Sequence, residues 1–423
     1  MRVRVIETLM VFLVCAVLFS TSSCGGSSAE DAGTADTGSP PDSGGPAPDA
    51  GGTPDAGGAP DAGYSKAAKL TRGPWLGNVT AEGITVRWET DREAQAAVEY
   101  AGASAGTVVG TTTAHMWKVG IDAKEVSRFQ HSAALSGLEA GATFNFTIPD
   151  LREAAEGSFV TAPAQKKPFR FAVYGDSRAA APYLEDHAEH RALAAAIAGE
   201  SPEFYINTGD LVFAGAMDGE WYLFFDTSGP IMPLSPFYPV AGNHEEGGEK
   251  TWAALFDLPG DGEANLYYSF DYSNSHFIVL CSGCGLGAAD PQIAWFSSDI
   301  AAAAQNAEVE NVFVAFHEPA YTYSDHSADG DAQANVVPLL KQHGVRAVFS
   351  GHNHLYERIQ MEGVTYLTLG GGGAPLYDLD EGEKPGLVKA EKVRHYAVFD
   401  VDGTAVHVKV KKEDGTEIEA FDL

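Results

Sequence analysis

Apolar and polar residues alternate along this chain in two different ways. Between residues 68 and 163 the apolar positions recur at every second residue, as at 84–88 and 143–148, with turn residues between the runs. A period of two is typical of strands with one buried face, and no long segment of helical period intervenes. This part is therefore predicted to form a small all-β sandwich, with Trp88 in its core.

From residue 168 to residue 423 short apolar runs alternate with segments of helical period, which predicts an α/β fold. The predicted strands span 169–174, 204–208, 236–240, 276–281, 311–316 and 345–349, and the predicted helices span 186–199, 290–304 and 333–343. Short polar motifs follow several of these strands directly. Because α/β folds gather ligands at the carboxyl ends of their strands, we expect the functional residues there.

Residues 1–24 have the pattern of an export signal. Arg2 and Arg4 precede an uninterrupted apolar run at 9–19, which is too short to span a bilayer as a helix. Small residues then lead to Cys24, which resembles the lipidation site of a bacterial lipoprotein; plain secretion or an uncleaved anchor are the alternatives. In each case we expect an exported protein: an outer-membrane or cell-surface lipoprotein that meets the membrane only through its lipid, or a secreted or periplasmic protein.

Residues 25–67 are predicted to form a disordered tether. Between 25 and 63 the sequence Pro-Asp-Ala-Gly recurs with a period of six, together with seven acidic residues and no basic ones. Such a segment cannot bury enough apolar surface to offset the entropy lost on ordering. We expect it to separate the folded domains from the membrane.

Charge and cysteine content narrow the possibilities further. The net charge of −31 argues against nucleic acid as a partner, because no basic stripe is present to neutralise phosphates. Cys281 and Cys284 form a Cys-Ser-Gly-Cys segment. Outside the cytoplasm this spacing favours a local disulfide over a redox site, and these thiols are not counted as metal ligands.

Candidate metal ligands occur in five short motifs. The motifs are Gly-Asp-Ser-Arg at 175–178, Gly-Asp-Leu-Val-Phe at 209–213, Gly-Asn-His-Glu at 242–245, Phe-His-Glu-Pro at 316–319 and Gly-His-Asn-His at 351–354. They supply Asp176, Asp210, Asn243, His317, His352 and His354. Oxygen and nitrogen ligands without a thiolate suit two Fe, Mn or Zn ions better than a structural zinc site. Paired metal ions recur in enzymes that hydrolyse phosphate esters.

With these motifs the chain resembles the calcineurin-like metallophosphoesterases and, more narrowly, a bacterial relative of the purple acid phosphatases. The resemblance covers residues 68–423 and includes the segments 267–272, 351–358 and 370–377. It implies a four-layer α/β catalytic core of two packed mixed sheets flanked by helices at 168–423. The preceding domain at 68–163 resembles a fibronectin type III domain.

The resemblance also implies roles for individual residues. The first metal would be bound by Asp176, Asp210 and His354, and the second by Asp210, Asn243, His317 and His352. Asp210 would bridge ions about 3.5–4 Å apart. A metal-bound hydroxide would attack the phosphate monoester, and His244 would protonate the leaving group.

Two positions depart from the family pattern. Phe213 stands where the purple enzymes have Tyr, and Arg178 stands where other members have a ligating His. Neither side chain binds a metal, so the first ion has one protein ligand fewer. Water could fill the place, the ion could bind weakly, or Arg178 could hold the phosphate oxygens; a purely structural salt bridge of Arg178 is the remaining alternative. Without a tyrosinate, iron-loaded protein is not expected to be purple.

Other polar residues receive supporting roles. His326 lies in a polar loop after His317 and is a candidate substrate-binding residue. His187 and His190 are predicted to lie on a solvated helix face, because acidic residues surround them. Glu245 and residues 356–358 are predicted to brace the ligand loops, and the glycine run 370–373 to pass close beneath them.

The sequence therefore predicts an exported, metal-dependent phosphoesterase that acts on phosphate monoesters. A phosphodiesterase of the same fold is the nearest alternative. A non-catalytic, metal-stabilised binding protein is a third possibility, favoured by the missing ligand and disfavoured by His244, which metal binding alone does not require.

Overall fold

The computed structural model describes residues 67–423, except 120–121, 123, 183–185 and 260–264. The predicted export signal with Cys24, and the predicted tether up to residue 66, lie outside the described residues. Across the described part of the chain, none of the helices combines the length and the apolar character needed to cross a membrane.

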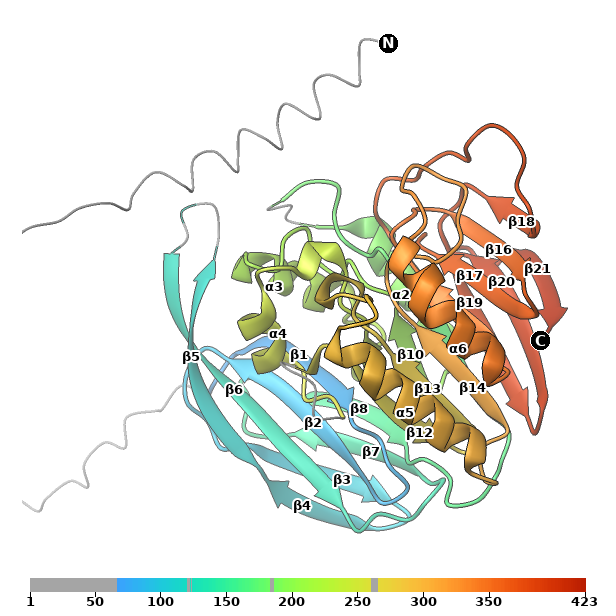
Figure 1. Ribbon diagram of the computed structural model, residues 1–423. Coiled ribbons are helices and arrows are strands. Elements are labelled where there is room, and N and C mark those ends of the chain that lie inside the picture. Colours follow the sequence, from blue (N-terminus) through green and yellow to red (C-terminus); the bar gives the residue numbers. More distant parts are fainter. Residues whose placement is uncertain (1–66, 120–121, 123, 183–185, 260–264) are drawn as a thin grey trace, which may run out of the picture. The chain divides into compact units, whose positions relative to one another are not determined.

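The first part of the described chain consists of two antiparallel four-stranded sheets (Figure 1). One sheet contains β1 (Leu70–Gly77), β2 (Gly83–Thr90), β6 (Lys124–Ser136) and β5 (Thr111–Val119) in that order, and the other contains β4 (Ala105–Val109), β3 (Ala97–Gly102), β7 (Thr143–Ile148) and β8 (Ala155–Val160). Alternate residues of β2 and β7 are fully buried in one shared core, among them Trp88 and Phe144. The predicted all-β sandwich is thus present.

The second part contains two larger mixed sheets. The six-stranded sheet has the order β11 (Phe237–Pro239), β10 (Phe204–Asn207), β9 (Phe169–Tyr174), β19 (His395–Asp402), β20 (Ala405–Lys412) and β21 (Glu417–Asp422). The seven-stranded sheet has the order β12 (Tyr268–Tyr272), β13 (Ser275–Val279), β14 (Asn311–Ala315), β15 (Ala347–Ser350), β17 (Val364–Leu369), β16 (Tyr356–Met361) and β18 (Leu387–Glu391). Strands β9 to β11 are mutually parallel, as are β13, β14, β15 and β17.

Helices and short helical turns connect and cover these strands (Figure 1). They are α2 (Ala188–Gly199), α3 (Asp218–Thr227), α4 (Glu249–Leu255), α5 (Pro291–Gln305), α6 (Val337–Gln342), the 3-10 turns η1 (Asn243–Glu245) and η3 (Ser282–Cys284), and the π-helical turn η4 (Ala332–Val336). Phe296 and Ile300 of α5 share a core with Val314 of β14, so this helix covers the outer face of the seven-stranded sheet.

An aromatic layer joins the two mixed sheets. The Phe171 ring in β9 packs edge-on against Phe277 and Phe313 of the other sheet, at centroid distances of 5.2 and 5.4 Å, and stacks on Phe399 of its own sheet at 4.6 Å. All four side chains are at most 1% exposed. Because each buried phenylalanine contributes about 1.5–3 kcal/mol, this layer fixes the position of one sheet on the other.

The predicted fold class is confirmed: a β sandwich precedes an α/β core of two packed mixed sheets. Each predicted strand and helix of the core is present, although the helix expected at 333–343 begins as the π-helical turn η4. The strand β12, the helices α3 and α4 and the strands from β16 onward were not predicted.

A buried ion pair within the sandwich binds Tyr222 of α3 and so ties the sandwich to the α/β core. Glu89 of β2 accepts hydrogen bonds from Thr71 (2.7 Å), from the indole of Trp117 (2.6 Å) and from the hydroxyl of Tyr222 on α3 (2.8 Å). The guanidinium of Arg72 lies 3.5 Å from Glu89 and 4.1 Å from the centre of the Tyr222 ring. Both charged side chains are fully buried, so neither has water as an alternative partner.

We predict that Glu89→Ala lowers the free energy of unfolding by about 3–5 kcal/mol. The substitution leaves Arg72 buried without its counter-ion and removes the acceptor of three hydrogen bonds. Urea unfolding followed by tryptophan fluorescence measures the change. Glu99→Ala, at an exposed position on β3, is the control and should change stability by less than about 0.5 kcal/mol. Equal effects of the two substitutions would contradict a stabilising role of this pair.

Candidate metal centre

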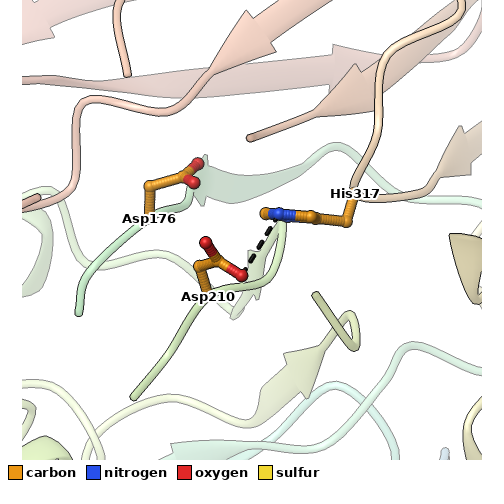
Figure 2. Close-up of side chains that lie close together, drawn as sticks. All are labelled: Asp176, Asp210 and His317. Carbon is orange, nitrogen blue, oxygen red and sulfur yellow. Dashed lines mark ion pairs between the residues drawn. The ribbon is translucent and has the colours of Figure 1, made fainter. Parts of the chain in front are cut away.

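The candidate ligands lie together where parallel strands of both mixed sheets end. They follow β9 (Asp176), β10 (Asp210), β11 (Asn243), β14 (His317) and β15 (His352 and His354). Figure 2 shows that Asp176, Asp210 and His317 point toward one another from separate loops. The carboxyl ends of these strands thus build a single site, as the placement of the motifs in the sequence predicts.

Two carboxylates and two imidazoles form the buried part of the centre. One ligand atom from each of Asp176, Asp210 and His317 lies within 4.8 Å of the others. His317 Nε2 is 3.2 Å from Asp210 Oδ1, and His354 Nε2 is 3.4 Å from Asp176 Oδ1. All four side chains are at most 2% exposed, so the negative charge has little solvation by water. Such a cluster is a strong attractor of cations.

Asn243 lies between His317 and a third imidazole, that of His352. Its Oδ1 lies 3.2 Å from His317 Nε2 and 3.0 Å from His352 Nδ1. Burial, with a further contribution from His317, lowers the pKa of His352 to about 2. His352 is therefore a neutral imidazole, which is the form that binds metals.

Backbone carbonyls orient two of the imidazoles. His317 Nδ1 donates to the carbonyl of Thr208 at 2.8 Å, and His354 Nδ1 donates to that of Pro375 at 2.7 Å. In the neutral form of each ring, Nε2 then carries the lone pair, and this atom lies beside the carboxylates. Burial lowers the pKa of His317, but the charges of Asp210 and Asp176 outweigh burial and raise it. Imidazole lone pairs next to carboxylate oxygens are suitable ligands for two divalent or trivalent cations.

Three of the candidate ligands have an unusual backbone conformation. Asp176, Asp210 and His352 have φ values of 57°, 54° and 68°, in the left-handed region that costs non-glycine residues free energy. The glycine run predicted to pass close to these loops does so. A Cβ atom on Gly370 would lie 2.8 Å from Asp176 Oδ2, and one on Gly372 would lie 2.2 Å from the carbonyl oxygen of Gly175.

Glu245 holds two ligand loops together. Its Oε1 accepts the N–H groups of Leu211 (2.9 Å) and Val212 (3.2 Å), and its Oε2 accepts those of Asp210 (2.9 Å) and Gly242 (2.8 Å). Burial and the neighbouring Asp210 raise the pKa of Glu245 to about 8, and the backbone donors oppose that rise. The predicted bracing role of Glu245 is confirmed.

The loop that carries His326 is fixed against the last motif. Asn353 accepts the N–H of His326 at 2.9 Å and donates to the carbonyl of His326 and to Thr322 Oγ1. Glu357 accepts the N–H of Tyr323 at 2.9 Å. The His326 ring consequently lies 4.1 Å from that of His352, beside the candidate ligands. The sequence assigned no role to Asn353, although its place between two candidate ligands was a signal.

Arg178, Phe213 and His244 form a group beside Asp210. Arg178 Nε is 3.5 Å and His244 Nε2 is 3.8 Å from Asp210 Oδ2. The Phe213 ring lies 5.9 Å from the guanidinium of Arg178 and meets the imidazole of His244 edge-on at 5.7 Å. The backbone carbonyl of Phe213 accepts a hydrogen bond from His244 Nδ1. Burial lowers the pKa of His244, and Asp210 opposes this. Phe213 thus supports both polar side chains instead of binding a cation.

The prediction that His187 and His190 face solvent is wrong, because they are 5% and 0% exposed. Helix α2 turns this face inward, where His190 is hydrogen-bonded to Tyr174 (3.0 Å) and Thr227 (2.8 Å). His187 Nε2 is 3.1 Å from the carbonyl oxygen of Arg178 and so supports the first ligand loop.

The predicted disulfide between Cys281 and Cys284 is confirmed. Ser282, between the two cysteines, accepts the N–H of Glu318 at 3.0 Å. Because Glu318 directly follows His317, the disulfide loop contacts the metal-ligand loop.

Comparisons with known proteins find a matching family model and similar sequences. Residues 169–356 match the calcineurin-like phosphoesterase family model. Purple acid phosphatase 18 of Arabidopsis thaliana is 28% identical over 266 residues, which cover 57% of this chain and 58% of the relative. The uncharacterized protein Rv2577 of Mycobacterium tuberculosis is 28% identical over 250 residues, which cover 50% of this chain and 46% of the relative. The chain thus spans about half the length of these curated relatives.

A solved structure shares the fold. Purple acid phosphatase PPD1 from yellow lupin (Lupinus luteus) seeds superposes with a TM-score of 0.70 at 16% identity. The superposition covers 82% of this chain and 73% of that one, so it includes more than the α/β core.

We predict that Glu245→Gln weakens metal binding about 10- to 100-fold. A glutamine offers one acceptor oxygen in place of two, so some of the four backbone N–H groups lose their partner and the two loops shift. Competition with a coloured chelator measures the affinity. Glu246→Gln, at the adjacent exposed position, is the matched control. Wild-type affinity in Glu245→Gln would show that the brace does not position the ligands.

Proposed function

We propose that this chain, which carries a calcineurin-like phosphoesterase domain at residues 169–356, is a metal-dependent hydrolase of phosphate monoesters. The observation that supports the proposal most strongly is the convergence of Asp176, Asp210 and His317 from three separate loops. The relationship to purple acid phosphatases supports the same class of reaction.

The proposed ligand sets are those that the resemblance implies, and short distances within each set support them. Asp176, Asp210 and His354 would hold one cation, and Asp210, Asn243, His317 and His352 the other, with Fe, Mn or Zn as the candidates. When bound, two such cations activate a water molecule and polarise the phosphoryl oxygens.

Positive charge at the centre would allow this acidic protein to bind an anionic substrate. The net charge of −31 is spread over the whole chain, and its field is screened within about 8 Å at physiological salt. Two divalent cations would outweigh the two carboxylates, and the guanidinium of Arg178 adds a further positive charge. The centre therefore attracts a phosphate group although the surrounding surface repels it.

His244 is the proposed proton donor to the leaving group. Its Nδ1 is engaged by the carbonyl of Phe213, so Nε2 is the atom that faces the centre. Transfer of a proton from Nε2 requires the doubly protonated ring; burial lowers the pKa of His244 and disfavours that form, and the nearby Asp210 carboxylate opposes this effect.

Arg178 is the proposed clamp for the phosphoryl oxygens. Its Nε is buried and makes no hydrogen bond within the described part of the protein, and its position beside Asp210 directs the guanidinium at the centre. A guanidinium pairs with two oxygens of a phosphate at once. Water would then complete the coordination of the first cation.

Export is a separate part of the proposal. The apolar run at 9–19 and the small residues before Cys24 support a lipid-anchored or secreted enzyme. The contact with a membrane would be made by the N-terminal lipid alone.

Purified protein with known metal content should hydrolyse an aryl phosphate monoester faster than the corresponding diester, and a chelator should abolish turnover. His244→Ala should lower kcat about 10²- to 10⁴-fold while elemental analysis shows unchanged metal content. Faster cleavage of the diester would favour the phosphodiesterase. Bound metal without turnover of either ester would favour a non-catalytic binding protein.

Arg178→Ala should weaken the binding of inorganic phosphate at least about tenfold, because a charge-assisted pair with the anion is lost. Isothermal titration with the metal-loaded protein measures this affinity. Arg191→Ala is the control, since the Arg191 side chain is 40% exposed on α2. Unchanged phosphate affinity in Arg178→Ala would leave Arg178 only its ion pair with Asp210.

A further inference from the structure

Tyr377 is a polar side chain at the candidate centre to which neither the motifs nor the proposed function assigns a role. It follows the glycine run 370–373, and its backbone N–H donates to the carbonyl of His354 at 3.0 Å. Two residues earlier, Pro375 accepts the hydrogen bond from His354 Nδ1. The segment that carries Tyr377 is therefore held directly beside the last candidate ligand.

The ring of Tyr377 contacts two histidines of the candidate centre. It stacks on His354 with a centroid distance of 4.0 Å and an interplanar angle of 18°. It meets His326 edge-on at 5.4 Å. One contact is thus to a candidate metal ligand and the other to the candidate substrate-binding residue.

The side chain of Tyr377 lies beside charged and imidazole groups of the candidate centre. Burial raises the pKa of Tyr377, the charge of Arg178 opposes this rise, and Asp176, Asp210 and Asp325 add to it; Arg178, Asp176 and Asp210 belong to the candidate centre. The side chain is half-buried, and no hydrogen bond to another described residue engages its hydroxyl. A phenol in this position offers a free donor to a bound ligand.

Phe213 stands where the purple enzymes have Tyr, so the second motif supplies no phenol and Tyr377 is a phenol from elsewhere in the chain. The Phe213 ring contacts Arg178 and His244, which lie beside Asp210, and supplies no polar atom from its side chain. The ring of Tyr377 stacks on His354, another of the three candidate ligands of the first cation. The first-cation side of the centre therefore has a phenol, although it comes from a different segment of the chain.

We propose that Tyr377 is a substrate-binding residue whose hydroxyl donates a hydrogen bond to a phosphoryl oxygen of the ester, while its ring fixes the imidazole of His354. This inference rests on the proposed phosphoesterase function. With Arg178 near Asp210 and Tyr377 near His354, two donors from separate loops would hold the phosphoryl group at the metal centre.

Tyr377→Phe tests the hydroxyl alone, because the ring and its stacking are kept. Metal-loaded variant protein should bind inorganic phosphate about tenfold more weakly and show a KM for an aryl phosphate monoester raised to a similar extent, with unchanged metal content. Tyr377→Ala should in addition retain less metal, since His354 loses its stacking partner. Tyr321→Phe is the control, because the Tyr321 ring packs on Tyr366, a residue outside the candidate centre.

The outcomes separate this inference from the proposed function. If the wild-type protein binds metal and turns over the monoester but Tyr377→Phe matches it in phosphate affinity and KM, the inference is wrong and the function stands. If the wild-type protein neither binds metal nor cleaves an ester, both fail. A visible charge-transfer band in iron-loaded wild type that disappears in Tyr377→Phe would make Tyr377 a metal ligand and overturn its role toward substrate.

Discussion

The buried carboxylates of Asp176 and Asp210 are the constraint on which the rest of this structure depends. Both are nearly inaccessible to water and lie close enough to share a ligand sphere with His317. Burying negative charge at such a place is costly unless cations compensate it. The neighbouring backbone holds the two carboxylates in place. Both aspartates have left-handed backbone conformations, and Glu245 accepts hydrogen bonds from four backbone N–H groups of the two adjoining loops.

The two departures from the family pattern belong together. Arg178 places a permanent cation beside Asp210, and Phe213 supplies an aromatic face for the guanidinium and a carbonyl for His244. Where relatives have a metal-binding side chain, this chain has the positive charge of Arg178. That charge favours binding of a phosphate anion over tight binding of a metal cation. Tyr377 stacks on His354, so the proposed site of the first cation has an aromatic side chain beside it but no aromatic ligand from the second motif.

The positions of several core strands along the chain and the convergence of the candidate ligands could be predicted because each motif directly follows an apolar run, and that local pattern survives folding. The burial of His187 and His190 could not, because acidic neighbours suggest solvent while the packing of α2 decides which face turns inward. The cluster around Glu89 joins residues 133 positions apart, at Tyr222, and no local pattern marks such a pair. The missed hairpin of β16 and β17 did carry a signal: Glu362 and Gly363 form its two-residue turn, and both have positive φ.

The central claim is that Asp210 joins two cations. Anomalous diffraction from crystals of the protein grown with Mn²⁺ tests it most directly, because the metal positions are then observed independently of activity. The account predicts two anomalous peaks about 3.5–4 Å apart, with Asp210 coordinating both and His317 and His354 on opposite sides. A single peak, or ions outside the coordination distance of Asp210, would contradict it.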